Sequence, residues 1–467
     1  MPAPDVIVIG AGFAGLSAAV AVAARGARVL VLEARPGLGG RASAFTDPET
    51  GELVDNGQHA LFGCYHQTFR FLRTIGTDGL VRLHEQLEIE VIDSEGRRSR
   101  LRSAALPPPM HLVGGLLSWD ALSWRDRGAA LLAAPALVRA AWRYAHGYAP
   151  DAQAQRETVS TWLRRHGQTP RLCALLWEPL AVAALNQQMD VAAAAPFVRV
   201  LAEMFGGSRR DAAIGLPRVP LDALYAKPAE RWLVERGSAV RTGATAHVVC
   251  AGGAVSHVEV RGERIRSSAV VCAAPWHALE RTIVGAPPSL AALIARASAM
   301  GSSPIVTVNL WLDRRVTDVP FVGLPGRTMQ WVFDKRQAFG EVASHLCLVS
   351  SGAEDIVARS NRELVDLAVG EIRAALPPAR AAQVLRAVVV REKRATFSLA
   401  PGQPPRPQTT TPVAGLFLAG DWIDTGLPAT IESAVVSGYW AAKAIATANS
   451  ISSRPHRPGE FRRSSRS

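Results

Sequence analysis

Three glycines near the start of the chain have the spacing of a turn that binds phosphate groups. They form the pattern Gly10-x-Gly12-x-x-Gly15, between an apolar run at residues 6–9 and a stretch of small residues. The first glycine permits the tight bend, the second lets a pyrophosphate approach the backbone, and the third allows close packing of helix on strand. A helix N-terminus there favours negative charge. The pattern predicts a dinucleotide held by Gly10, Ala11, Gly12, Ala14 and Gly15.

An acidic residue and a second glycine turn follow at distances that suit the same ligand. Glu33 ends the next expected strand, where a carboxylate can accept hydrogen bonds from both adenosine ribose hydroxyls and disfavours a 2′-phosphate. Residues 34–41 then bring a glycine-rich turn and a cation close to the same pyrophosphate. A bare backbone and a positive charge suit a long, extended cofactor, so we predict FAD. The expected contacts in this segment are Ala34, Arg35, Gly39, Gly40 and Arg41.

A strand–helix–strand unit must position these motifs. Residues 5–9 have the pattern of a buried parallel strand, 15–25 of a helix and 28–32 of the next strand. Later segments are expected to rejoin this nucleotide domain, the last of them leading into a helix from about 430 through 448. The expected later strands are 239–243, 255–260, 269–272 and 415–419.

The 467 residues exceed what a single core organises, which is roughly 250 to 300 residues, so two interleaved domains are expected. A substrate domain is predicted to interrupt the nucleotide domain twice: 107–230 holds apolar helices, including 129–144 and 171–185, and 287–394 mixes strands with a helix at 362–376. The nucleotide domain would then comprise 1–106, 231–286 and 395–448, and 449–467 is predicted to be a disordered basic tail.

The net charge of +12 and the pI near 10.2 allow an electrostatic partner but do not require one. No nucleic-acid-binding motif is present, so we predict no nucleic-acid partner. The five cysteines are scattered without a Cys-x-x-Cys pair, which predicts neither a disulfide framework nor a metal site. The chain has no basic leader and no apolar stretch of about 18 residues, so we expect a cytoplasmic protein without a membrane-spanning helix.

The segment from Glu33 to Arg41 resembles the FAD-dependent amine oxidase and phytoene desaturase superfamily. Its members carry a Gly-Asp pair near the C-terminus whose carboxylate binds the flavin ribityl chain, which implies this role for Gly420 and Asp421. A helix N-terminus would face the flavin pyrimidine, where its dipole stabilises the anionic reduced flavin. The matching positions are Ala429, Thr430 and Ile431. The implied fold is α/β, a Rossmann-like FAD-binding domain of the amine-oxidase type with an inserted α+β substrate domain.

Two departures from the wider superfamily bear on the cofactor. No cysteine lies near Gly420 to form a thioether link, so FAD is expected to bind noncovalently. A second glycine-rich dinucleotide motif is also missing, so electrons must be exchanged with an external partner.

Residues 54–65 carry a closer resemblance, to the squalene-associated FAD-dependent desaturases, the hydroxysqualene dehydroxylases of bacterial hopanoid synthesis. Similarity continues at 177–180, 185–186, 216–221, 419–422 and 426–430. This resemblance implies reduction of hydroxysqualene to squalene, in which loss of water leaves an allylic cation that a hydride from reduced flavin quenches. It also implies that Gly57, Gln58 and His59 approach the flavin.

An acid must protonate the leaving hydroxyl, and His59 and Asp55 are the candidates on the segment expected near the flavin. Asp55 could instead cap a turn, and His59 could contact flavin through its backbone alone. Glu178 and Asn186 are weaker candidates. Two other functions stay open: a carotenoid desaturase or saturase with the same cofactor, and a noncatalytic isoprenoid carrier, as in the GDP-dissociation inhibitors.

The apolar insert at 116–143 interleaves leucine and tryptophan with four arginines. Tryptophan and arginine beside an apolar face suit the bilayer interface, where a C30 isoprenoid is found. Packing on the domain core explains the same pattern. Peripheral membrane contact is therefore one of two expectations for this segment.

Overall fold

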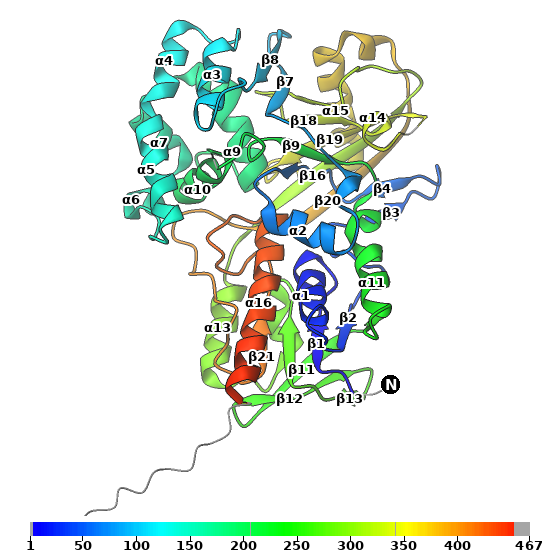
Figure 1. The fold of residues 1–467 in the computed structure, drawn as a ribbon. Coiled ribbons are helices and arrows are strands. Elements are labelled where there is room, and N and C mark those ends of the chain that lie inside the picture. Colours follow the sequence, from blue (N-terminus) through cyan, green and yellow to red (C-terminus); the bar gives the residue numbers. More distant parts are fainter. Residues whose placement is uncertain (1–2, 206, 341, 453–467) are drawn as a thin grey trace, which may run out of the picture.

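A five-stranded parallel sheet is the base from which the predicted dinucleotide turn emerges. The computed structural model describes residues 3–205, 207–340 and 342–452, and this sheet lies in the lower half of Figure 1. All its neighbouring strands are parallel. Strands buried along their whole length, as four of these are, occur where helices cover both faces. The strand order is β10 (Ala239–Arg241), β2 (Val29–Leu32), β1 (Val6–Ile9), β14 (Ala269–Cys272) and β21 (Leu416–Leu418).

Two helices from opposite ends of the chain pack side by side on this sheet (Figure 1). They are α1 (Phe13–Ala23) and α16 (Ile431–Ser452), both expected from the sequence within a few residues. A Cβ atom at Gly438 would overlap the Ser17 side chain and the Ala14 carbonyl, so only glycine permits this approach. The predicted α/β class, with a Rossmann-like parallel sheet, is confirmed.

A seven-stranded mixed sheet lies above the nucleotide sheet in Figure 1. Its strand order is β20 (Val384–Phe397), β16 (Ser302–Leu312), β19 (Ser344–Ser351), β18 (Trp331–Asp334), β17 (Phe321–Gly323), β7 (Glu88–Ile92) and β8 (Arg98–Arg102). Helix α15 (Asn361–Ala375) begins with a capping box and buries its apolar face against this sheet. Strands β7 and β8 precede residue 107 yet pair within this sheet, and the division of the chain into domains stays a prediction.

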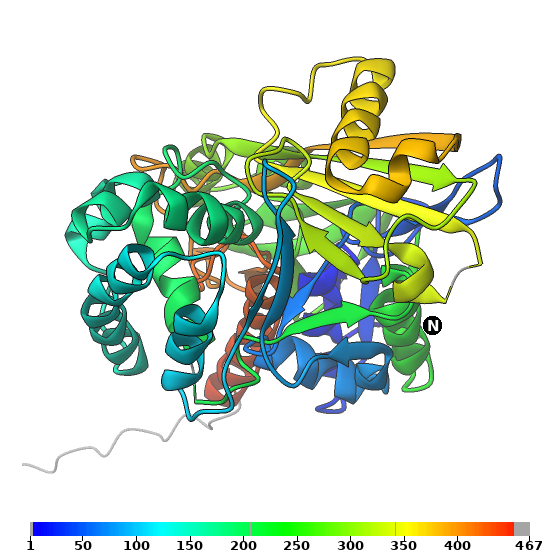
Figure 2. The same ribbon diagram turned by 90° about the horizontal axis from the view of Figure 1, so that it is seen from above.

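Helices of the insert lie beside the seven-stranded sheet, as Figure 2 shows from above. The single helix predicted for 129–144 is wrong, because the chain bends at Ala133, just before Pro135, and forms two helices. The helix predicted for 171–185 contains a π-helical turn at Cys173–Trp177. The helices are α3 (Met110–Ser118), α4 (Trp124–Leu132), α5 (Ala134–Ala145), α6 (Ala152–Arg156), α7 (Val159–Arg165), α8 (Pro170–Leu172), α9 (Glu178–Leu185) and α10 (Ala194–Phe205).

Smaller sheets complete the fold. The strand predicted at 255–260 is β12 (Ala254–Val260), and it pairs with β11 (Ala246–Ala251) in a separate four-stranded sheet. The other elements are β13 (Glu263–Ile265), β15 (Ile283–Val284), β3 (Ala44–Thr46), β4 (Leu53–Asp55), β5 (Leu61–Phe62), β6 (Val81–Leu83), β9 (Ile214–Pro217), α2 (His66–Thr74), α11 (Lys227–Val234), α12 (Leu279–Thr282), α13 (Pro288–Ser298) and α14 (Lys335–Phe339). The predicted tail at 449–467 lies largely outside the described residues.

Candidate active site

One continuous cavity of about 930 Å³ joins the glycine turn to the seven-stranded sheet and the helical insert. Its polar lining includes residues of the predicted cofactor segments, such as Gly12, Glu33, Arg41 and Asp421, and others such as Thr307 and Arg394. The remaining lining is largely apolar. It includes Leu87, Ile89, Val91, Leu101, Trp119, Leu175, Leu176, Leu180, Ile305, Phe321, Trp331 and Phe333. The cavity can therefore receive a charged, extended molecule and a hydrocarbon together.

The glycine turn has the geometry that its spacing predicts. Gly10 has a φ of +100°, and a Cβ there would lie 2.9 Å from the Ala273 carbonyl oxygen. A Cβ at Gly15 would overlap the Gly10 carbonyl oxygen, so this glycine sets the approach of α1 to β1. A Cβ at Gly12 would have the Gly39 carbonyl oxygen, 3.9 Å away, as its nearest neighbour. The Gly12 backbone is therefore open toward the cavity. This arrangement fits a pyrophosphate.

Glu33 holds the two glycine-rich turns together. Its buried carboxylate accepts hydrogen bonds from the Ala11 backbone N–H at 2.8 Å and from the Arg35 backbone N–H at 2.9 Å. Each carboxylate oxygen can accept a second bond. Glu33 lines the cavity and could therefore also accept ribose hydroxyls, as predicted.

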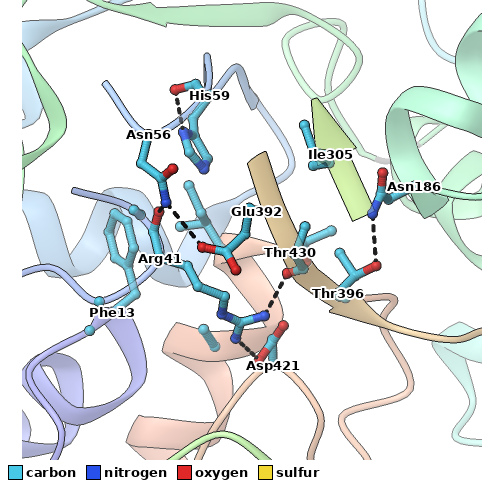
Figure 3. A pocket seen from close by; sticks show the side chains of 18 of the residues that line it. Phe13, Arg41, Asn56, His59, Asn186, Ile305, Glu392, Thr396, Asp421 and Thr430 are labelled. Atoms are coloured by element: carbon cyan, nitrogen blue, oxygen red, sulfur yellow. Dashed lines mark hydrogen bonds and ion pairs between the residues drawn. The ribbon is translucent and has the colours of Figure 1, made fainter. Parts of the chain in front are cut away.

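Two predicted cofactor residues that lie 380 positions apart in the sequence form an ion pair. The Arg41 Nη2 lies 2.5 Å from the Asp421 Oδ1, and Arg41 Nη1 donates to the Ala395 carbonyl at 2.6 Å (Figure 3). Burial opposes the charged guanidinium, but the Asp421 carboxylate outweighs it and raises the pKa of Arg41. A cationic Arg41 thus lies beside the cavity, where a pyrophosphate or ribityl chain could bind.

The other predicted cofactor positions also line the cavity, except Ala11, whose backbone N–H is bonded to Glu33. Ala429, Thr430 and Ile431 lie at the N-terminus of α16, and Gly57, Gln58 and His59 follow β4. The Gln58 Oε1 is buried and has no hydrogen-bond partner among the described residues. A buried amide oxygen without a partner is costly, and a bound ligand with a donor would satisfy it. This oxygen and the open Gly12 backbone show that the site fits a cofactor such as FAD.

His59 faces the cavity, and its Nδ1 lies 3.2 Å from the Gly57 carbonyl oxygen. Burial disfavours the charged imidazole and lowers the pKa of His59, although the Asp55 carboxylate opposes this shift. A neutral imidazole is a poor proton donor to a leaving hydroxyl. The geometry therefore suits hydrogen bonding by His59 better than general acid catalysis.

We expect the pKa of His59 to lie below that of an ordinary histidine, because burial disfavours the charged imidazole. Because the unfolded chain then binds a proton that the folded chain does not, the free energy of unfolding should fall as pH drops below about 6.5. Histidine NMR titration, with His59→Gln to identify the signal, measures this directly. A His59 signal that titrates with an ordinary or raised pKa would contradict the expectation.

Asp55 does not line the cavity. Its Oδ2 lies 2.9 Å from the Lys335 Nζ, its Oδ1 accepts from the Leu221 backbone N–H, and both charged side chains are almost completely buried. Of the two predicted acids, only His59 therefore lines the cavity. An ion-paired carboxylate that is shielded from the cavity suits a structural role.

The two weaker candidates differ. Asn186 lines the cavity, but both polar atoms of its amide are hydrogen-bonded to protein groups. Nδ2 donates to Thr396 Oγ1 at 3.0 Å, and Oδ1 accepts from the Gly352 N–H at 2.8 Å. Burial raises the pKa of Glu178, and Asp190 adds to this shift, but Glu178 does not line the cavity. Neither side chain is placed to meet a substrate hydroxyl.

Among the polar cavity residues that sequence reasoning missed are Asn56 and Glu392. The Asn56 Nδ2 donates to the Glu392 Oε2 at 3.2 Å (Figure 3). Glu392 lies in the charged run Arg391 to Arg394 of strand β20, so its charge alone was no signal that it faces a cavity. No group of three or more histidines, cysteines and acids in the described ranges could hold a metal ion.

Comparisons with known proteins agree with this architecture. Residues 13–446 match the family model for flavin containing amine oxidoreductases. A hydroxysqualene dehydroxylase of Rhodopseudomonas palustris is 30% identical, across 94% of this chain and 98% of its own length. A 15-cis-phytoene desaturase of Synechococcus elongatus is 25% identical, across 94% and 95%. An oxidoreductase structure from Methanosarcina mazei has a TM-score of 0.73 at 15% identity, covering 94% and 99%, which shows the fold alone. The chain belongs to the flavin-containing amine oxidoreductase family.

Proposed function

We propose that this protein binds FAD noncovalently and reduces hydroxysqualene to squalene. One observation carries the proposal: the cavity that begins at a dinucleotide turn continues into a chamber with a largely apolar lining, as a C30 isoprenoid requires. Similarity to the hydroxysqualene dehydroxylase of Rhodopseudomonas palustris over nearly the whole chain supports the choice of substrate.

The residues that would hold FAD are those that sequence analysis predicted and that line the cavity. When bound and reduced, FAD would supply the hydride equivalent that replaces the hydroxyl. Arg41 would neutralise phosphate charge, Glu33 would accept ribose hydroxyls, and the α16 N-terminus would favour negative charge on the cofactor. No cysteine is among the described lining residues, which supports noncovalent binding. The apolar walls would exclude water from the reacting carbon.

Coexpression with enzymes that produce hydroxysqualene tests the proposal. Extracts should contain squalene in place of hydroxysqualene when this chain is present. Hydroxysqualene that accumulates unchanged, with the flavoprotein expressed and folded, would contradict the proposal.

A phytoene desaturase or saturase is the second candidate, favoured by the similarity to the Synechococcus elongatus phytoene desaturase. It would use the same cavity but remove hydrogen from a polyene, or add hydrogen to one. Reduction of the flavin when phytoene is added to the oxidised protein would support this alternative. A noncatalytic carrier would purify without a flavin absorption band. The presence of Glu33, Arg41 and Asp421, all expected to bind FAD, argues against this function.

We further propose that helices α4 and α5 contact an anionic membrane surface at the cytoplasmic face. Trp124, Leu132, Val138 and Trp142, which we call the α4–α5 surface, are 80%, 61%, 59% and 55% exposed. Arg139 lies within the shallow groove on this surface. Apolar side chains beside arginine suit the lipid interface. In the part of the chain that the structure describes, no helix combines the length and apolarity needed to cross a bilayer.

The variant Leu132→Ser/Val138→Ser/Trp142→Ser should bind anionic vesicles at least about tenfold more weakly, because each apolar side chain contributes about 1.5–3 kcal/mol when fully buried. Vesicle cosedimentation measures the bound fraction. Leu385→Ser is the matched control, since Leu385 is 68% exposed on β20, outside the α4–α5 surface. Equal binding of the wild type and the triple variant would exclude this surface as the membrane contact.

A further inference from the structure

The seven-stranded sheet projects one carboxylate into the cavity. Glu392 on β20 lies directly opposite Ile305 on β16, and both residues line the cavity. Cross-strand partners share one face of a sheet, and so do residues two apart on a strand, which places Val390 on the same face. Thr307 pairs with Val390 and lines the cavity too, so Glu392 is the charged residue among neutral neighbours on this part of the wall.

An irregular pairing aims this part of β20 at the predicted cofactor residues. The step from Ser303 to Ile305 on β16 is opposed by the longer step from Thr396 back to Glu392 on β20. Such bulges re-aim side chains and are frequent beside active sites. Within this bulge the Ala395 carbonyl accepts a hydrogen bond from Arg41. The same irregularity thus fixes Arg41 and presents Glu392.

Three carboxylates line the cavity in the described part of the chain. Glu33 accepts two backbone N–H groups, and Asp421 is paired with Arg41. The Glu392 carboxylate has a side-chain hydrogen bond with the neutral Asn56 amide, and it interacts electrostatically with Arg41 without an ion-pair contact among the described residues. Glu392 is therefore the cavity carboxylate best able to exchange a proton with a ligand.

Asn56 determines which oxygen of Glu392 can carry that proton. Its Nδ2 donates both to the Arg41 carbonyl at 3.0 Å and to the Glu392 Oε2 at 3.2 Å. Two acceptors on one side fix the orientation of this amide. Oε2 is thus an acceptor, and Oε1 is left to carry a proton. Figure 3 shows the Glu392 side chain among Asn56, Arg41 and Thr430.

We propose that Glu392 is the acid that protonates the leaving hydroxyl, an assignment that rests on the proposed dehydroxylation. The proton moves from Glu392 Oε1 to the hydroxyl oxygen, the allylic C–O bond breaks, and water leaves. The resulting carboxylate then faces the allylic cation and stabilises it. Bound reduced FAD would supply the hydride equivalent, two electrons and one hydrogen, that the cation needs, and solvent would return a proton to Glu392.

Two measurements on the FAD-loaded protein test this assignment. The first is squalene formation by the reduced protein, where Glu392→Gln should be slower by about 100-fold or more, as for loss of a general acid. Glu392→Asp keeps the acid one methylene further back and should recover part of the rate. The matched control is Glu235→Gln, the same change at an exposed carboxylate on the surface. FAD content and thermal stability of each variant report on folding.

The second measurement is binding to the oxidised protein, which does not depend on turnover. The probe is a squalene analogue with a protonated tertiary amine in place of the carbon that bears the hydroxyl. Glu392→Gln should bind this cation at least about tenfold more weakly, which is about 1.4 kcal/mol, and should bind neutral squalene equally well. Glu235→Gln should match the wild type with both ligands.

The outcomes separate the two proposals. If the wild type forms squalene and Glu392→Gln forms it within threefold of the same rate, the assignment of Glu392 is overturned and the proposed function stands. If Glu392→Gln does not fold, a Glu392→Asp variant with the wild-type rate and cation affinity overturns the assignment. If the wild type forms no squalene, the proposed function itself fails.

Discussion

A Gly15→Ala variant is expected to purify with at least about tenfold less FAD than the wild type, equivalent to a loss of about 1.4 kcal/mol or more in binding. The added Cβ would overlap the Gly10 carbonyl oxygen, so α1 must move away from β1. That movement displaces the helix N-terminus on which the phosphates would rest. Overpacking of this kind also lowers the free energy of unfolding by about 1–3 kcal/mol. Flavin absorbance per protein and urea unfolding measure the two effects.

Gly37→Ala is the matched control in the neighbouring glycine-rich segment. A Cβ at Gly37 would meet nothing within 4 Å, so this variant should keep its FAD and its stability. Full flavin content in Gly15→Ala would contradict the assignment of the turn as the phosphate site. Equal losses of FAD and stability in both variants would show that the effect of Gly15→Ala is not specific to the turn between β1 and α1.

A Lys335→Met variant should lose about 3–5 kcal/mol of unfolding free energy, because it leaves the buried Asp55 carboxylate without its ion-pair partner. The double variant Asp55→Asn/Lys335→Met should regain much of that loss, since no uncompensated charge remains. Urea unfolding of the wild type, both single variants and the double variant gives the coupling energy.

The same set of variants tests whether Asp55 transfers a proton. If its role is structural, the folded double variant should keep a substantial rate of squalene formation. A double variant that is as stable as the wild type and fully loaded with FAD, yet inactive, would restore Asp55 as a catalytic candidate. A Lys335→Met variant with wild-type stability would contradict the buried ion pair.

The parts of the fold that depend on short sequence patterns could be predicted. Glycine spacing specifies the turn between β1 and α1, because the glycines are required by local steric constraints. The buried strands are recognisable as continuous apolar runs. Glu33 was also predicted at the end of β2, because it directly follows that strand's apolar run. Arg41 was predicted from the turn that carries it and Asp421 from the family resemblance, both for one ligand, and the structure places them in contact.

Features that depend on distant parts of the chain could not be read from local patterns. Asp55 was predicted near the flavin because its segment was expected there, but its carboxylate pairs with Lys335, 280 residues later, and does not line the cavity. Strand β7 pairs with β17 and β8 pairs with β7, and no local pattern reveals the position of β17. Glu392 faces the cavity because of its register with β16 and the adjacent bulge, neither of which is encoded within β20 alone.

Anaerobic mixing of the reduced, FAD-loaded protein with hydroxysqualene tests the central claim most directly. We expect the flavin to be reoxidised in a single turnover, with squalene formed in an amount that matches the bound FAD. A flavin that stays reduced, with no squalene formed, would contradict the proposed dehydroxylation.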